Sequence, residues 1–416
     1  MRNNIRNIKK KVKISPKTLN KKVTAPSSKS IMQRAVALGL LSTGKTLIHN
    51  PSFSHDSLSS MRIAGSLGAT LQFSLNKLAV ERNDNVADTK LNFGESGLGI
   101  RLFSPVAAIF NKEYEINGTG SLLNRPMEPI VHALNQAGAE ASAENGLLPL
   151  KIKGELTGGK IEIDGSHGSQ VLTGLLTALP KAKNDSEIIV KNLKSKPYID
   201  ITLDLINHFG VVVEHENYER FLIQGNQNYI SQEIVVEGDW SGSAFLLVAG
   251  LIAGKMTVSG LNLNSKQADK AILNGIKNAG GKITISENEI TTEKSELQAF
   301  EFDATDCPDL FPPLATLASY CNGTSKIKGI KRLIHKESDR SVALINEFSK
   351  IGIKIHTEDD TMFIEGGKVT GGITDSNNDH RIAMAVATAA LGGEGDVIIE
   401  NSDCVNKSYP NFYYDI

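Results

Sequence analysis

Cysteine is scarce in this chain of 416 residues, which holds only Cys307, Cys321 and Cys404. Their spacing forms no CxxC pair, and no histidine cluster lies beside them, so the sequence predicts neither a disulfide framework nor a structural zinc site. We expect all three thiols to pack in the core of a protein of the reducing cytoplasm.

The chain also lacks long apolar runs and an excess of one charge. No apolar stretch approaches the roughly 20 residues that a membrane span requires. Lys and Arg number 45 and Asp and Glu 46, which argues against a surface adapted to nucleic acid or to an anionic membrane. Residues 1–22 are the exception, because they are basic with no acidic residue. A transit peptide or a nucleic-acid-binding arm would explain them, but Val12–Ile14 alternates like a strand and we favour a solvated terminus.

A repeat is present instead. Six segments rich in small and apolar residues recur about every 70 residues, as in repeat proteins. They begin near Lys29, Gly97, Ser169, Ser241, Asp309 and His380. Each predicts a helix that is apolar nearly all round and therefore buried against other helices, followed by a strand.

A second helix type lies between these segments. Apolar residues at steps of three and four, as in Leu344, Phe348 and Ile351, predict a single buried face. Each stretch closes on a glycine, where a helix C-cap needs a left-handed residue. These glycines are Gly68, Gly138, Gly210, Gly280 and Gly352. Further strands follow, so the unit is βαβαββ; the sixth copy is short, and we expect an N-terminal strand to complete the last domain.

Polar residues mark the starts of the buried helices. Serine or aspartate stands there as Ser30, Ser169, Ser241 and Asp309. Plain N-capping would explain these residues singly. It does not explain the neighbouring cations, which are Lys29, Arg34, Arg101 and Arg381, because a helix N-terminus carries partial positive charge. Binding of phosphate or carboxylate groups explains both.

Three other clusters have ordinary explanations when taken alone. Residues 335–340 suit a capped helix start, residues 195–200 suit a helix that begins at a proline, and residues 406–410 suit an exposed loop.

In combination and in order, these motifs resemble the EPSP synthase family over residues 23–412. The matching residues are Lys29-Ser30 with Arg34, Gly97 with Arg101, Asn124-Arg125-Pro126, Ser169-Gln170, Ser195-Lys196-Pro197-Tyr198, Asp306 with Asp309, Lys336-Glu337-Ser338-Asp339-Arg340, Asp379-His380-Arg381 and Lys407-Ser408. The resemblance implies an α/β (α+β) fold of two similar domains, each of three βαβαββ repeats with buried parallel helices, and a cleft between the domains. It assigns 25–236 to one lobe, mainly the shikimate 3-phosphate side. It assigns 1–24 plus 237–416 to the other lobe, which carries the phosphoenolpyruvate side and the catalytic acid and base.

The reaction that the resemblance implies is transfer of the enolpyruvyl group of phosphoenolpyruvate to the 5-hydroxyl of shikimate 3-phosphate, with loss of phosphate, in chorismate and aromatic amino acid biosynthesis. It implies small-molecule substrates, no metal or organic cofactor, no nucleic-acid or membrane partner, and a monomer. Asp309 would be the base, and Glu337 the acid with Lys29 beside it. Glyphosate would compete with phosphoenolpyruvate.

By the same resemblance, the pocket for shikimate 3-phosphate comprises Ser30, Arg34, Ser169, Gln170, Ser195, Tyr198, Asp309 and Lys336. The phosphoenolpyruvate site comprises Lys29, Gly97, Arg125, Gln170, Arg340, Arg381 and Lys407. Arg101 and His380 would support it. Arginine suits such a site because its planar fork binds carboxylate and phosphate oxygens in pairs.

Some positions depart from the family pattern. Glu95 and Leu98 stand within the segment before Arg101, Gly168 replaces a serine, and Arg332 replaces an asparagine. A carboxylate at Glu95 would repel a phosphate unless an arginine pairs with it. These departures leave the reaction class unchanged but put glyphosate sensitivity in question.

Two alternatives stay open at the level of sequence. UDP-N-acetylglucosamine enolpyruvyl transferase shares the fold, but Lys29 here precedes a serine rather than an asparagine, and no cysteine lies before Cys307. A non-catalytic anion-binding descendant is the other, although it would have no reason to keep Asp309, Glu337 and Arg381 together.

Overall fold

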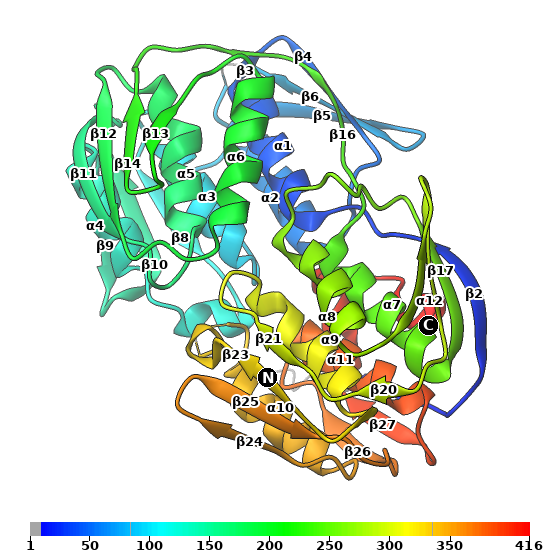
Figure 1. The fold of residues 1–416 in the computed structure, drawn as a ribbon. Coiled ribbons are helices and arrows are strands. Elements are labelled where there is room, and N and C mark those ends of the chain that lie inside the picture. The colour runs from blue at the N-terminus through cyan, green and yellow to red at the C-terminus, as the bar shows by residue number, and fades with distance from the viewer. Residues whose placement is uncertain (1–9, 84, 335) are drawn as a thin grey trace, which may run out of the picture. The chain divides into compact units, whose positions relative to one another are not determined.

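The computed structural model describes residues 10–83, 85–334 and 336–416. Arg2, Arg6 and Lys9 of the basic N-terminus, and His335 of the cluster at 335–340, lie outside this part. The chain forms two compact units (Figure 1). The first unit comprises Pro26–Asp239 and Asn264–Ala268, and the second comprises Met1–Ala25, Trp240–Leu263 and Asp269–Ile416.

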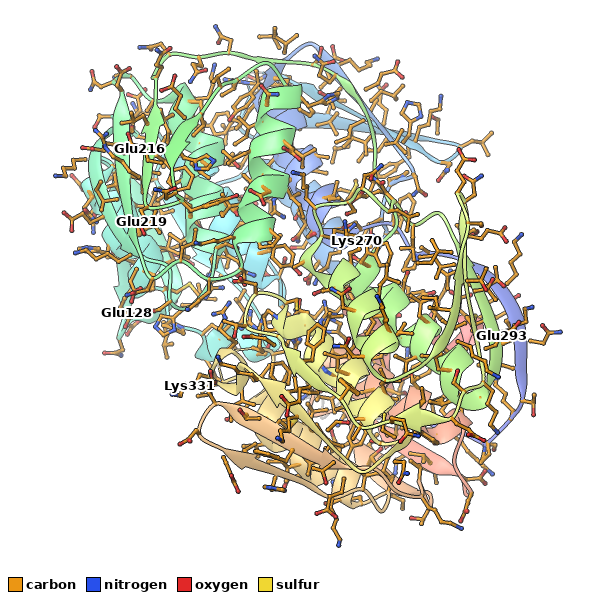
Figure 2. All side chains as sticks on the ribbon, in the orientation of Figure 1. Glu128, Glu216, Glu219, Lys270, Glu293 and Lys331 are labelled. Atoms are coloured by element: carbon orange, nitrogen blue, oxygen red, sulfur yellow. The ribbon has the colours of Figure 1, made fainter. Side chains whose placement is uncertain are left out.

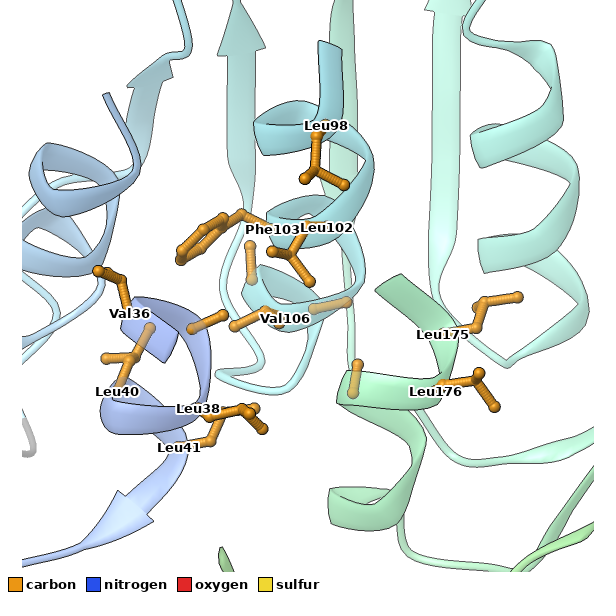
Figure 3. Packing of buried hydrophobic residues seen from close by; sticks show 14 of the residues in the cluster. Val36, Leu38, Leu40, Leu41, Leu98, Leu102, Phe103, Val106, Leu175 and Leu176 are labelled. Atoms are coloured by element: carbon orange, nitrogen blue, oxygen red, sulfur yellow. The ribbon is translucent and has the colours of Figure 1, made fainter. Parts of the chain in front are cut away.

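Three buried helices form the centre of the first unit. They are α1 (Lys29–Leu41), α3 (Gly97–Ala108) and α5 (Gln170–Ala178). Nearly every side chain of these helices is buried, because they are composed of Ala, Gly, Leu and other apolar residues on all faces. Figure 3 shows their apolar side chains in one cluster, with Val36 of α1, Phe103 of α3 and Leu176 of α5 among them.

The second unit repeats this arrangement with α7 (Trp240–Ala253), α9 (Phe311–Ala318) and α11 (His380–Leu391). Thr316 of α9 donates a hydrogen bond to the carbonyl of Ala385 in α11 at 3.0 Å, which requires close approach of the two helices. The prediction of six buried helices, three in each unit, is therefore confirmed.

The outer helices also follow the sequence pattern. They are α2 (His55–Ser66), α4 (Glu128–Gln136), α6 (Lys196–His208), α8 (Ile272–Asn278), α10 (Arg340–Ser349) and the short α12 (Phe412–Asp415). The five predicted closing glycines have φ between 73° and 104°. They are in the left-handed conformation that ends a helix.

Six sheets share one topology, in which the first two strands are parallel and each later strand is antiparallel to its neighbour. In the first unit the orders are β16 (Glu233–Val235), β4 (Lys45–His49), β6 (Lys77–Arg82), β5 (Ala69–Ser74); β7 (Lys90–Asn92), β8 (Tyr114–Asn117), β10 (Leu147–Lys153), β9 (Glu140–Glu144); and β11 (Gly159–Asp164), β12 (Ser186–Lys191), β14 (Arg220–Ile223), β13 (Glu214–Glu216).

In the second unit the orders are β2 (Leu19–Thr24), β17 (Gly254–Ser259), β19 (Glu289–Glu293), β18 (Lys282–Ile285); β21 (Glu301–Asp303), β23 (Thr324–Lys328), β25 (Thr361–Glu365), β24 (Ile355–Glu358); and β26 (Gly372–Asp375), β27 (Val397–Glu400), β1 (Lys11–Ile14). Two small pairs complete the strands, β3 (Ser42–Thr43) with β15 (Tyr229–Ile230) and β20 (Leu297–Gln298) with β22 (Cys321–Asn322).

Strands from distant parts of the chain close these sheets. β1 pairs antiparallel with β27, from Lys11 opposite Glu400 to Ile14 opposite Val397. The N-terminal strand thus completes the last repeat, as the sequence predicts. β2 and β16 likewise supply the first strands of the fourth and first repeats.

Two expectations need correction. Cys307 and Cys321 are buried, but Cys404 is only half-buried, because it lies in the irregular η6 (Ser402–Lys407) rather than in a buried helix. Asp309 does not begin α9. It lies in the preceding 3-10 turn, η4 (Pro308–Leu310), and the α-helix starts at Phe311.

Most charged side chains project outward from the outer elements, as Figure 2 shows for Glu128, Glu216 and Glu293, which are exposed. In the described ranges, no helix has both the length and the apolar character to cross a membrane. A smaller set of charged side chains is buried, and several of these lie at the starts of the inner helices. They include Arg34, Asp56, Arg125, Arg340, Asp379, Arg381 and Lys407.

Candidate active site

Lys29 is the first residue of α1, and its ammonium is held by a buried carboxylate. Nζ of Lys29 lies 3.1 Å from Oδ2 of Asp56, in the first turn of α2. Nε2 of Gln33 donates to the carbonyl of Asp56 at 3.0 Å and to Oγ of Ser96 at 2.7 Å. Ser96 in turn caps α3 by accepting from the amide of Gly99. The starts of α1, α2 and α3 are therefore connected around Lys29, and Asp56 was missed at the sequence level.

Arg125 and Gly97 lie against each other beside this cluster. Arg125 follows η1 (Gly120–Asn124) and is 8% exposed. A Cβ at Gly97 would lie 2.1 Å from Nη1 of Arg125, so only glycine leaves room for the guanidinium. Arg101 connects the start of α3 to the segment that carries Arg125. Its Nη1 donates to the carbonyl of Gly97 at 3.0 Å, and its Nη2 donates to the carbonyl of Pro126 at 3.4 Å.

Arg34 is a buried connector of three helices. Nε donates to Oγ1 of Thr202 at 2.9 Å, Nη1 to the carbonyl of Ser30 at 2.8 Å, and Nη2 to the carbonyl of Tyr198 at 3.2 Å. Nη2 also lies 3.3 Å from Oγ1 of Thr173 in α5. Burial lowers the pKa of Arg34 to about 10, and the group remains a cation. The guanidinium thus positions the backbone at Ser30 and Tyr198. Its partners Thr173 and Thr202 were not identified from the sequence.

The serines at the helix starts are not simple caps. The N-cap of α1 is Ser28 rather than Ser30, and the Ser169 side chain makes no capping hydrogen bond to α5. The capping interpretation is therefore wrong for Ser30 and Ser169. Ser195 precedes α6 with φ of 60°, a conformation that costs energy for a serine. Ser169 and Ser195 are buried, whereas Ser30, Gln170 and Tyr198 are half-buried.

In the second unit, Arg340 binds three carboxylates. It is the first residue of α10, and its side chain is 1% exposed. Nη1 donates to Oδ1 of Asp309, Nη2 to Oε2 of Glu337 and Nε to Oδ2 of Asp379, each at 2.7 Å. The proposed base and acid are thus held on one guanidinium, although 28 residues separate them in the sequence (337 − 309).

Asp309 in turn receives three cations. Besides Arg340, Nζ of Lys336 lies 3.2 Å from Oδ1, and Nη2 of Arg381 lies 3.0 Å from Oδ2. Burial raises the pKa of Asp309, but the charges of Arg381, Lys336 and Arg340 outweigh it and hold the pKa well below its ordinary value. The carboxyl is therefore ionised at neutral pH.

Asp379 is fully buried and connects this cluster to α11. It is the N-cap of that helix and accepts from the amide of Arg381 at 3.0 Å. Its second oxygen also accepts from Oγ of Ser338 at 3.2 Å, and Nδ1 of His380 lies 3.7 Å from the carboxylate. One carboxylate thus orients the Arg340 guanidinium and the helix start that carries Arg381. The sequence placed Asp379 in a motif but gave it no role.

Lys407 ends η6, which packs against α11, and only 5% of the residue is exposed. The exposed-loop interpretation of residues 406–410 is wrong here, since Tyr409 is also buried.

Each unit therefore carries its own set of the predicted residues. The first holds Lys29, Ser30, Arg34, Gly97, Arg101, Arg125, Ser169, Gln170, Ser195 and Tyr198; the second holds Asp309, Lys336, Glu337, Arg340, His380, Arg381 and Lys407. Within the described part of the chain, no group of three or more His, Cys, Asp or Glu side chains could hold a metal ion. Chemically, the first set combines cations with hydroxyl and amide groups, which suits binding of anionic substrates. The second set combines cations with carboxyl groups, which suits proton transfer as well.

Comparison with known proteins agrees with this chemistry. A family model described as EPSP synthase (3-phosphoshikimate 1-carboxyvinyltransferase) matches residues 14–416. A 3-phosphoshikimate 1-carboxyvinyltransferase of Clostridium novyi is 38% identical over 417 residues, which cover 97% of this chain and 96% of the relative. One from Methanocaldococcus jannaschii is 37% identical over 401 residues, with coverage of 94% and 93%.

A solved structure of EPSP synthase from Acinetobacter baumannii has a TM-score of 0.82 and 24% identity, over 97% of this chain and 96% of that one. This likeness confirms the predicted α/β fold. The relatives named here are 3-phosphoshikimate 1-carboxyvinyltransferases and not UDP-N-acetylglucosamine enolpyruvyl transferases. From the family match and these relatives, the chain belongs to the EPSP synthase family of enzymes, the 3-phosphoshikimate 1-carboxyvinyltransferases.

Proposed function

We propose that this chain transfers the enolpyruvyl group of phosphoenolpyruvate to the 5-hydroxyl of shikimate 3-phosphate, giving 5-enolpyruvylshikimate 3-phosphate and phosphate. The observation that carries the proposal is that Arg340 holds both Asp309 and Glu337 at 2.7 Å. A base and an acid fixed on one cation, with further cations beside them, suit addition of a hydroxyl to an anionic enol phosphate.

Shikimate 3-phosphate would be bound from the first unit by hydroxyl, amide and phenol groups. These are Ser30, Ser169, Gln170, Ser195 and Tyr198. Arg34 connects the helices that carry Ser30 and Tyr198, so its contribution is to positioning as well as to charge. Lys336 and Asp309 would contact this substrate from the second unit.

Phosphoenolpyruvate would be bound by cations. They are Lys29, Arg125, Arg340, Arg381 and Lys407, together with Gln170 and the backbone of Gly97. Arg101 supports Gly97 and the segment of Arg125 through its two hydrogen bonds. His380 would support the start of α11 beside Arg381.

The proton transfers follow from the two carboxyl groups. Asp309 accepts the proton of the 5-hydroxyl, and the oxygen's electron pair forms a bond to C2 of phosphoenolpyruvate. The electrons of the C2–C3 double bond take a proton from Glu337, which is protonated for this step, and C3 becomes a methyl group. Lys29 would assist this acid. In the second half, the Glu337 carboxylate takes a proton back from C3 and the C2–C3 double bond re-forms. The C2–O bond to phosphate breaks with its electrons going to the phosphate oxygen, and the leaving phosphate takes the proton held by Asp309. The cations balance the charge of the intermediate.

Release of inorganic phosphate by the purified chain tests the proposal. We expect release only when both substrates are supplied, and none when UDP-N-acetylglucosamine replaces shikimate 3-phosphate. A full rate with either substrate alone, or no release with both, would contradict it. Glyphosate should raise the apparent KM for phosphoenolpyruvate; an inhibition constant in the millimolar range would count against this part.

A further inference from the structure

Both oxygens of the Asp309 carboxylate are engaged by cations. Oδ1 accepts from Arg340 at 2.7 Å and from Lys336 at 3.2 Å, and Oδ2 accepts from Arg381 at 3.0 Å. The same side chains are the cations that a phosphate or carboxylate ligand would need. The internal carboxylate therefore has the position and the charge of a small bound anion.

The cations of this cluster are already engaged by carboxylates. Lys336, Arg340 and Arg381 each pair with Asp309, and Arg340 also pairs with Glu337 and Asp379. Arg332 adds positive charge that acts on Asp309 and Lys336. An anionic ligand that binds Arg340, Arg381 or Lys336 therefore competes for these cations with one of the three carboxylates.

The geometry indicates which carboxylate gives way. Asp379 is fully buried and binds Arg340 through both Nε and Nη2. Glu337 binds the same guanidinium, and its side chain is 10% exposed. Asp309 is the most exposed of the three, with 23% of its side chain accessible. It bridges Arg340 of α10, Arg381 of α11 and Lys336 in the segment before α10. Of the three carboxylates, Asp309 can therefore be displaced with the smallest change to buried contacts.

We propose that Asp309 is an internal competitor for the substrate anion, which takes Arg381 from it on binding and so leaves Asp309 able to act as a base. The identity of the ligand as phosphoenolpyruvate rests on the proposed function, but the competition does not. Loss of neighbouring cations raises the proton affinity of a carboxylate. Binding of the anion and activation of the base are then one event.

The test compares binding of inorganic phosphate to the full chain and to Asp309→Asn by titration calorimetry at constant ionic strength. Asparagine keeps the shape of the side chain and removes its charge. We expect Asp309→Asn to bind phosphate at least about tenfold more tightly, which corresponds to about 1.4 kcal/mol. Phosphoenolpyruvate, titrated without shikimate 3-phosphate, should also bind more tightly to Asp309→Asn than to the unmutated chain.

Glu337→Gln is the matched control, because it removes from the same cluster a carboxyl group that is paired with Arg340. A general electrostatic effect would tighten phosphate binding equally in both variants, and this would overturn the proposal. Equal or weaker binding by Asp309→Asn would also overturn it. Circular dichroism establishes folding, and Asp309→Ala replaces the first variant if the asparagine form does not fold.

Failure of this proposal can be told apart from failure of the proposed function. If the unmutated chain releases phosphate when both substrates are supplied, but Asp309→Asn binds phosphate with unchanged affinity, only the proposal of an internal competitor is rejected. A chain without turnover, whose Asp309→Asn form nevertheless binds phosphate more tightly, rejects only the reaction.

Discussion

The guanidinium of Arg125 occupies the space that a side chain at Gly97 would need. A Cβ built on Gly97 lies 2.1 Å from Nη1 of Arg125, far inside contact distance. The absence of a side chain at the first residue of α3 thus decides where this cation can lie. Arg101 also holds Gly97 in place, because its Nη1 donates a hydrogen bond to the carbonyl of Gly97.

Gly97→Ala should therefore displace Arg125 without unfolding the first unit. We expect the KM for phosphoenolpyruvate to rise by about tenfold, which corresponds to the loss of about 1.4 kcal/mol of binding. Steady-state kinetics at a saturating concentration of shikimate 3-phosphate measure this KM. Gly65→Ala is the control, since its Cβ would meet only Leu71 at an ordinary 3.9 Å. An unchanged KM in Gly97→Ala would show that Arg125 does not bind this substrate.

Asp379→Asn should reveal how strongly the second unit depends on one buried carboxylate. Asparagine also caps helices well, so the bond to the Arg381 amide can persist while the charge opposite Arg340 is lost. Removing one partner of a buried ion pair costs about 3–5 kcal/mol, and we expect a loss of this size in the free energy of unfolding measured with urea.

The same variant should lower kcat/KM for phosphoenolpyruvate by about a hundredfold, because Arg340 loses the hydrogen bond from its Nε to Oδ2 and with it its orientation. Ser338→Ala removes only a 3.2 Å hydrogen bond to Asp379 and serves as the milder comparison. Reduced stability with unchanged kinetics would mean that Asp379 is structural and does not position Arg340 for the substrate.

Arg34→Lys should destabilise the first unit. Lysine keeps the charge but cannot donate to Thr202, Ser30 and Tyr198 at once. With buried acceptors left unsatisfied, we expect a loss of about 1–3 kcal/mol in the free energy of unfolding and a higher KM for shikimate 3-phosphate. Arg62→Lys, on an exposed position of α2, should change neither. Equal stability of the two variants would contradict the connector role.

Stability in acid should depend on Asp309. The charges of Arg381, Lys336 and Arg340 hold its folded-state pKa well below that of an unfolded carboxyl, near 3.9, despite the opposing effect of burial. Its ionised form therefore contributes stability above about pH 4, and this contribution is lost as the pH falls through the lower, folded-state pKa.

Urea midpoints of the unmutated chain and Asp309→Asn between about pH 3 and 7 test this linkage. We expect the difference between the two to be largest at neutral pH and to shrink on acidification. A difference that stays constant, or grows as the pH falls, would show that the carboxylate is not preferentially ionised in the folded chain.

Much of the fold could be predicted from sequence because its causes are local. Small apolar residues on every face make the inner helices buried wherever they pack, and Gly68, Gly210 and Gly352 end outer helices because the backbone there must be left-handed. The family motifs also identified most of the candidate site, since each motif stands at the start of a helix. The expectation that an N-terminal strand completes the last domain followed from the shortness of the sixth repeat, and β1 pairs with β27 there.

The partners of those motifs could not be obtained in this way. Asp309 meets Arg381 across 72 residues and Arg340 across 31, and Arg34 finds Thr202 across 168. Nothing local distinguishes Asp56 or Asp379 from a surface carboxylate, because burial is a property of the packed helices around them.

By itself, then, the sequence determined the repeat, the helix starts and the residue types that bind anions, because these depend on local patterning. Only the tertiary structure decided which cation each carboxylate neutralises, since that depends on where separate helix starts come together. In the folded chain, Arg34 of α1 contacts Thr202 of α6, and Asp379 accepts hydrogen bonds from Nε of Arg340 and the amide of Arg381. Asp309 lies among the cations that a substrate would need.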